Sequence, residues 1–148
     1  AGSMQLGALL ADAGKDSEKR IHDFAENLGI AFQLRDDYLD SFGDSEFGKK
    51  IGGDILADKK TILMVKLLES ESADEAFDII KNGNNINSEE KISAIKELYN
   101  REGIDRYVLS QIDEYYNKAL QNLEELNIDK EKMEPVFDLA AYIMNRDV

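Results

Sequence analysis

The chain has 148 residues, 43% of them hydrophobic, and a net charge of −13 from 31 acidic and 18 basic side chains. This length is enough for one domain with a hydrophobic core. The acidic balance argues against a nucleic-acid binder, since phosphate backbones require a basic surface. The absence of cysteine excludes disulfides and thiolate metal sites. No membrane-length apolar run or signal peptide is found, which predicts a cytoplasmic protein.

Helical periodicity dominates the sequence and strand alternation is nearly absent, which predicts an all-α chain. The first residues, AGSMQLGALLADAG, read as a helix already under way, so we expect a piece of a longer protein. The single proline, Pro135, falls near the start of the last predicted helix, where it is tolerated. The first predicted helix covers residues 3–13, and the second runs from a cap at Asp16 or Ser17 to Phe42. Two further helices begin at Thr61 and at Ala73. Another runs from a cap at Asn87 or Ser88 and ends before Gly103, and the next begins at Asp105.

The segment FQLRDDYLD, residues 32–40, places three carboxylates and an amide inside a hydrophobic stretch. At about 100° per residue, four polar side chains share one arc of roughly 100° on this helix: Gln33, Asp36, Asp37 and Asp40. The rest of this part of the helix is apolar nearly all round, which is typical of a buried helix. We therefore expect the acidic stripe to face a cavity or groove.

A partly buried cluster of carboxylates needs compensating positive charge. Unit charges near 4 Å repel by about 4 kcal/mol in such a setting, and Arg35 projects from the other side of the helix. Mg²⁺ prefers carboxylate and water oxygens and often shares its shell with a substrate's phosphates. The stripe therefore predicts a divalent-cation site. The alternative is an ordinary solvated face, since His22 and Glu26 extend the same stripe.

A loop rich in glycine and lysine is expected directly after the acidic helix, over residues 43–54. Glycines let a backbone approach an anion closely, and lysines supply point charges for phosphate. Together with the acids, this composition predicts a diphosphate site. The residues concerned are Gly48, Lys49, Lys50, Gly52, Gly53 and Asp54, followed by Lys59, Lys60 and Thr61.

These two segments resemble the second aspartate-rich motif and the downstream lysine loop of the trans-isoprenyl diphosphate synthases, the polyprenyl synthetase family. That family's pattern is G-x-x-F-Q-x-x-D-D-x-x-D, then G-K-x-x-G-x-D and K-x-T. The chain matches it at Gly29, Phe32, Gln33, Asp36, Asp37, Asp40, Gly48, Lys49, Gly52, Asp54, Lys59 and Thr61. LGALLADAG and LAAYIMNRDV are similar to the family's flanking and final helices.

The resemblance implies the C-terminal part of a single all-helical isoprenoid-synthase bundle over residues 1–148. The family's first aspartate-rich motif has no counterpart in these residues. The implied reaction is Mg²⁺-assisted ionisation of an allylic diphosphate, followed by condensation with isopentenyl diphosphate. We expect residues 1–148 alone to be inactive and the full-length protein to be a homodimer. Product chain length depends on residues near the missing motif.

The resemblance also assigns roles to individual residues. Asp36 is the expected direct Mg²⁺ ligand, with Asp37 and Asp40 binding directly or through water. Lys49 and Lys59 are expected to act in catalysis by holding the allylic diphosphate, and Lys50 can replace Lys49 after a one-residue shift. Gln33 is assigned to the catalytic set and, with Phe32, to the isopentenyl site. Thr61 and Arg146 complete the expected substrate-binding residues, Arg146 by closing the cavity at the chain's end.

Alternative functions remain open from the sequence. One is a non-catalytic, regulatory or structural subunit of a heteromeric prenyl synthase, which the complete acidic motif argues against. Another is a helical interaction module whose acidic face binds basic partners. A terpene cyclase is a closer relative, but its second metal motif has an Asn-Ser-Glu character that this sequence lacks.

Overall fold

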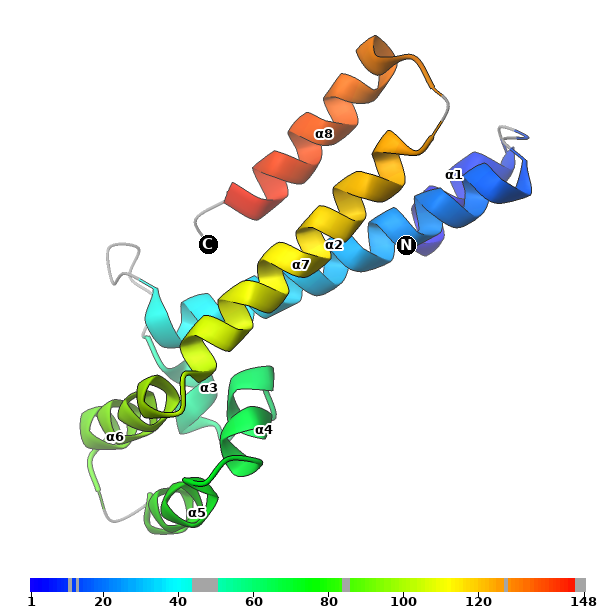
Figure 1. The fold of residues 1–148 in the computed structure, drawn as a ribbon. Coiled ribbons are helices and arrows are strands. Elements are labelled where there is room, and N and C mark those ends of the chain that lie inside the picture. The colour runs from blue at the N-terminus through cyan, green and yellow to red at the C-terminus, as the bar shows by residue number, and fades with distance from the viewer. Residues whose placement is uncertain (11, 13, 44–50, 84–85, 127, 146–148) are drawn as a thin grey trace. The chain divides into compact units, whose positions relative to one another are not determined.

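The computed structural model is helical throughout the residues that it describes (Figure 1), which confirms the predicted all-α class. No strand occurs among those residues, and none of their helices is long and apolar enough to cross a membrane. The described residues are 1–10, 12, 14–43, 51–83, 86–126 and 128–145. The helices are α1 (Gly2–Leu10), α2 (Lys15–Phe42), α3 (Gly53–Leu56), α4 (Ile62–Leu68), α5 (Ala73–Asn82), α6 (Ser88–Arg101), α7 (Ile104–Glu124) and α8 (Lys130–Asn145).

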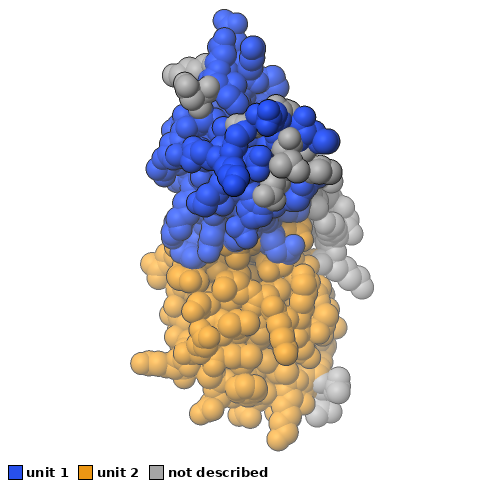
Figure 2. Space-filling model, turned by 90° about the vertical axis from the view of Figure 1, so that its right-hand side faces the viewer, with its two compact units in different colours: residues 1–33, 111–147 blue, residues 34–110, 148 orange. Residues whose placement is uncertain are grey.

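The chain divides into two compact units (Figure 2). Unit 1 comprises residues 1–33 and 111–147, which hold α1, most of α2, the second part of α7, and α8. Unit 2 comprises residues 34–110, which hold the end of α2, the helices α3 to α6, and the first residues of α7. The acidic motif and the lysine segment that follows it therefore fall in unit 2.

Several helix boundaries differ from the sequence prediction. α1 ends at Leu10 rather than at residue 13, and Asp12 beyond it has a positive φ of 52°. Asp16 and Ser17 do not cap α2, because the helix begins at Lys15 and the Gly14 carbonyl accepts the Glu18 N–H. Asp16 lies instead in the first turn, where an acid interacts favourably with the helix dipole.

Two further predictions need correction in the second half of the fold. Pro135 lies inside α8, beyond its first turn, where it has no N–H to donate to the Glu131 carbonyl. Both residues are exposed, so water can reach that carbonyl. Helical spacing after Asp105 places Tyr107 on the apolar side of the predicted helix, but Tyr107 is exposed. The Lys66 ammonium lies 5.5 Å from its ring centroid.

Unit 2 has a compact core in which α6 contacts α3, α4 and α5. The start of α6 is fixed by a capping box: the Asn87 side chain accepts the Glu90 N–H, and the Glu90 carboxylate accepts the Asn87 N–H. Thr61 caps α4 in a similar way by accepting the Met64 N–H. The fully buried side chains include Ile55, Leu63, Leu67, Ala76, Ile95, Leu98, Tyr99 and Val108.

Unit 1 leaves several large apolar side chains exposed. Leu10, Leu139 and Tyr142 are the most exposed of these. A hollow of about 870 Å³ lies where α7 leads into α8, lined by Leu123, Glu124, Leu126, Ile128, Glu131, Met133, Glu134 and Phe137. Exposed apolar surface of this kind is typical of a contact face for other chain segments or partners.

The packing of α4 generates a stability prediction. Leu67→Ala should lower the free energy of unfolding by about 2–5 kcal/mol, because the fully buried Leu67 would leave a cavity. Val65→Ala on the same helix is the matched control, with an expected loss below about 1 kcal/mol, since Val65 is 38% exposed. Urea denaturation measures both. Equal losses for the two variants would contradict the described orientation of α4.

Candidate functional site

The acidic motif ends α2, and its three carboxylates are withdrawn from solvent to different degrees. Asp37 is buried, while Asp36 and Asp40 are half-buried. The burial expected of this stripe therefore holds in full for Asp37 and in part for Asp36 and Asp40, whereas Gln33 on the same stripe is exposed. That the stripe faces a cavity stays a prediction. A carboxylate removed from water favours the neutral form unless cations or hydrogen bonds compensate it.

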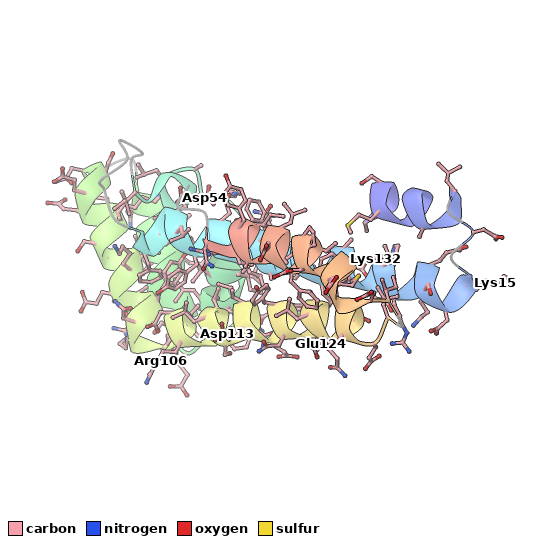
Figure 3. The ribbon with its side chains drawn as sticks, turned by 90° about the horizontal axis from the view of Figure 1, so that it is seen from above. Lys15, Asp54, Arg106, Asp113, Glu124 and Lys132 are labelled. Atoms are coloured by element: carbon pink, nitrogen blue, oxygen red, sulfur yellow. The ribbon has the colours of Figure 1, made fainter. Side chains whose placement is uncertain are left out.

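The segment after the acidic motif returns to Asp40 and forms the short helix α3. The Gly52 N–H donates to the Asp40 backbone carbonyl at 2.6 Å, and the Asp54 N–H donates to Asp40 Oδ2 at 2.8 Å. A β-carbon at Gly53 would lie 3.3 Å from Asp40 Oδ1, so glycine permits this close approach. Figure 3 shows the labelled Asp54 beside the end of α2. The loop predicted to continue through residue 54 is therefore helical from Gly53 onward.

Lys59 brings positive charge to the carboxylates. Its ammonium lies 2.7 Å from Asp54 Oδ2 and 3.4 Å from Asp37 Oδ1. The hydrogen bond that it donates to Asp54, together with the charge of Asp37, raises the pKa of Lys59 above its usual value. Lys59 thus remains a cation and links α3 to the end of α2.

Asp40 carries a different electrostatic signature. Burial raises its pKa above the usual aspartate value, and the negative charges of Asp54 and Asp36 act in the same direction. The N–H donated by Asp54 and the charge of Lys59 oppose this rise. Among the described residues of the cluster, the acids thus outnumber the one lysine, Lys59.

Tyr99 was not predicted as a site residue, yet it lies beneath this cluster. It is fully buried on α6, its ring lies 6.1 Å from that of Phe42, and Phe42 stacks on Tyr38 with centroids 4.9 Å apart. Burial, followed by the charges of Asp54 and Asp40, raises the pKa of the Tyr99 hydroxyl. No motif in the sequence singles out Tyr99. In the sequence, Tyr38 and Phe42 fall on the apolar side of their helix, which predicts packing, and the stacking of their rings confirms it.

The remaining predicted site residues have different positions. Thr61 is buried, and its hydroxyl oxygen caps α4, so a role toward substrate stays a prediction. Phe32 is half-buried and Gln33 is exposed; both belong to unit 1. Lys49, Lys50 and Arg146 lie outside the described residues, so their predicted roles stay predictions.

The donor set in unit 2 fits a hard divalent cation. It consists of carboxylate oxygens, the ligands that Mg²⁺ prefers. Within the described part of the chain, Asp36 has no hydrogen bond or ion pair, although it is half-buried beside other acids. Among the described residues, three potential ligand atoms come within 4.8 Å of one another at His22, Asp23 and Glu26 in unit 1 and not at the motif aspartates. Nothing further distinguishes the His22 group from neighbouring charges on a helix surface.

Comparison with known proteins assigns the chain to a family. The sequence model described as "Polyprenyl synthetase" matches residues 1–101. A geranylgeranyl diphosphate synthase from Sulfolobus acidocaldarius is 35% identical over 84% of this chain and 38% of its own length. A heptaprenyl diphosphate synthase component 2 from Geobacillus stearothermophilus is 36% identical over 99% of this chain and 45% of its own length.

Solved structures agree with the sequence relatives. A crystal structure of a geranylgeranyl pyrophosphate synthase aligns with a TM-score of 0.80 and 37% identity, covering 97% of this chain and 46% of that one. The chain thus spans less than half the length of these relatives. The matched residues include the acidic motif and the α3–Lys59 segment. On this evidence, the chain belongs to the polyprenyl synthetase family.

Proposed function

We propose that the protein containing this chain is a prenyltransferase that adds isopentenyl diphosphate to an allylic diphosphate. The observation that supports it is the set of contacts in unit 2 that join Asp40 to Asp54 and the Lys59 ammonium to both Asp54 and Asp37. The relatives' names, geranylgeranyl and heptaprenyl diphosphate synthase, support this reaction class. We also propose that residues 1–148 form the C-terminal part of one helical domain and do not turn over substrate alone.

Asp36, Asp37 and Asp40 would hold Mg²⁺, which when bound supplies positive charge for the leaving diphosphate. Lys59, kept protonated by its two carboxylate neighbours, donates hydrogen bonds to oxygens of the allylic diphosphate. The allylic C–O bond breaks and its electron pair leaves with the diphosphate. The double bond of isopentenyl diphosphate then attacks the allylic cation, and loss of a proton restores a neutral alkene.

One second candidate has an observation in its favour. The Geobacillus relative is named "component 2", which indicates a synthase built from more than one kind of chain. On that reading, the full-length protein needs a different partner chain for activity instead of forming the predicted homodimer. Assaying the full-length protein alone separates the two, since activity without a partner chain favours the single-component synthase.

Substitution of the proposed direct metal ligand tests the reaction. Asp36→Asn in the full-length protein should lower kcat/KM by about 10²–10³-fold. A neutral amide binds Mg²⁺ weakly, so less positive charge would be held beside the leaving diphosphate. Asp78→Asn, at an exposed acid on α5, is the control and should change kcat/KM less than twofold. A steady-state assay of prenyl transfer measures both. A similar small effect of the two changes would rule out Asp36 as a ligand.

Ligand binding by residues 1–148 separates a diphosphate site from an acidic interaction surface. A bisphosphonate with Mg²⁺ at about 100 times its Kd should stabilise the chain by about 2.7 kcal/mol and raise Tm by about 5–10 °C. Mg²⁺ alone or simple salt should have a much smaller effect. Thermal denaturation gives the comparison. Equal shifts with bisphosphonate and with sulfate at matched ionic strength would favour the interaction-module alternative.

Asp40 should show opposite effects on stability and on ligand binding. Its raised pKa means that the folded chain binds this proton more tightly than the unfolded chain, so the contribution to stability is present at low pH and lost as pH rises through that pKa. Asp40→Asn keeps an oxygen for the Asp54 N–H and removes the charge. At pH 7 without Mg²⁺, Tm should rise by less than about 4 °C, since solvent screens a half-exposed group.

The same Asp40→Asn variant should lose part of the stabilisation by Mg²⁺ and bisphosphonate. The two measurements need only thermal denaturation at pH 7 with and without ligand. A lower Tm without ligand would show that the charge of Asp40, and not only its oxygen, stabilises α3.

A further inference from the structure

Two positive backbone dihedrals bracket the helix that carries Asp54. Gly52, which precedes α3, has a φ of 83°, and Asp58, which follows it, has a φ of 48°. Lys59 comes directly after Asp58. The position of its ammonium therefore depends on a left-handed residue that is not glycine, a conformation that is unfavourable for most L-residues and that Asp adopts only occasionally.

The end of α3 has the hydrogen-bond pattern of a Schellman motif. The Lys59 N–H donates to the Asp54 carbonyl at 3.0 Å, and the Asp58 N–H donates to the Ile55 carbonyl at 3.2 Å. Asp58 occupies the left-handed position that glycine usually takes in this motif. A contact that holds Asp58 in this conformation would therefore stabilise the turn.

Consecutive residues at the start of α6 contact both ends of α3. A β-carbon at Gly52 would lie 2.7 Å from the side chain of Ile92, so Ile92 packs directly on that backbone. The Lys91 ammonium lies 2.7 Å from Asp58 Oδ1. Because the capping box at Asn87 and Glu90 fixes this turn of α6, the two contacts have a rigid origin.

The pairing of Lys91 with Asp58 is asymmetric in burial. The Lys91 side chain is 7% exposed, whereas that of Asp58 is 46% exposed. Gly83, at the end of α5, leaves room for Lys91, since a β-carbon there would lie 3.2 Å from both its Cδ and its Nζ. Burying an ammonium is costly, and an apolar side chain would fill the same space more cheaply. The buried charge therefore indicates a role for the contact itself.

We propose that Lys91 is a positioning residue for Lys59: by holding Asp58 in its left-handed conformation, it keeps the Lys59 ammonium between Asp37 and Asp54, where the diphosphate binds. The proposal rests on the proposed function for the meaning of that last position. Lys91 contacts Asp58 and needs no contact with substrate. Because Asp58 and Lys59 are adjacent, the backbone conformation of Asp58 sets the direction in which the Lys59 side chain leaves the chain.

Lys91→Met in the full-length protein is the primary test. Methionine fills the space of the lysine stem, and the half-exposed Asp58 that loses its partner stays hydrated, so the fold should persist. We expect KM for the allylic diphosphate to rise about tenfold, while KM for isopentenyl diphosphate changes less than twofold. Lys96→Met, which removes a cation from the same helix at its contact with Phe42, is the control and should leave both KM values unchanged.

A second substitution separates positioning from mere stability. Glycine adopts positive φ without strain, so Lys91→Met combined with Asp58→Gly restores the left-handed turn without an ion pair. KM for the allylic diphosphate should return to within about threefold of the unmodified protein. If Lys91→Met raised KM only by destabilising the whole fold, the additional removal of the Asp58 side chain would not restore KM.

The outcomes distinguish this proposal from the proposed function. Acetylation of Lys59 by a limiting reagent, followed by mass spectrometry, reports its engagement without any assay of activity. Its rate should increase about threefold or more in Lys91→Met and fall again in the double variant. Unchanged labelling and KM in Lys91→Met, or no recovery in the double variant, would overturn the role of Lys91. An inactive unmodified protein with the expected labelling pattern would instead count against the prenyltransferase function.

Discussion

The return of the chain onto Asp40 is the constraint on which the site depends. Asp36, Asp37 and Asp40 lie at the end of one helix, and partial burial makes the repulsion between their charges stronger than it would be in water. The segment that follows supplies an N–H to the Asp40 carboxylate and the Lys59 ammonium to Asp37. The same segment adds a fourth acid, Asp54, so compensation among the described residues is partial. In the proposed site, the negative charge of these acids would attract Mg²⁺.

Asp40 illustrates how one side chain serves both fold and chemistry. Its carboxylate accepts the Asp54 N–H and its backbone carbonyl accepts the Gly52 N–H, so it fixes the start of α3. The proposed Mg²⁺ site also uses its charge. Asp40 therefore meets two requirements: an oxygen that accepts the Asp54 N–H, and a negative charge for Mg²⁺. An amide at this position would meet the first requirement but not the second. Functional carboxylates commonly reduce stability in this way.

The sequence was sufficient for the helical class, the acidic stripe and the order of the helices after Thr61, because these depend on local periodicity and capping. Of the two predicted cap candidates for α6, Asn87 is the cap. The helix predicted from Thr61 begins at Ile62, with Thr61 as its cap. The sequence was insufficient where tertiary contacts decide. Glycines and charges around residue 54 indicated a loop, whereas hydrogen bonds to Asp40 stabilise a short helix there. No motif singles out Tyr99, and only its burial under Asp40 and Asp54 relates it to the site.

The left-handed Asp58 has a consequence for how such chains can diverge. A glycine at position 58 would adopt this turn without a stabilising contact. A buried lysine at position 91 would then lack its ion-pair partner and would destabilise the fold. An aspartate at 58 instead makes that cation necessary. Neither exchange is favourable alone, so the two positions are expected to change together among descendants of one ancestor, although 33 residues separate them along the chain.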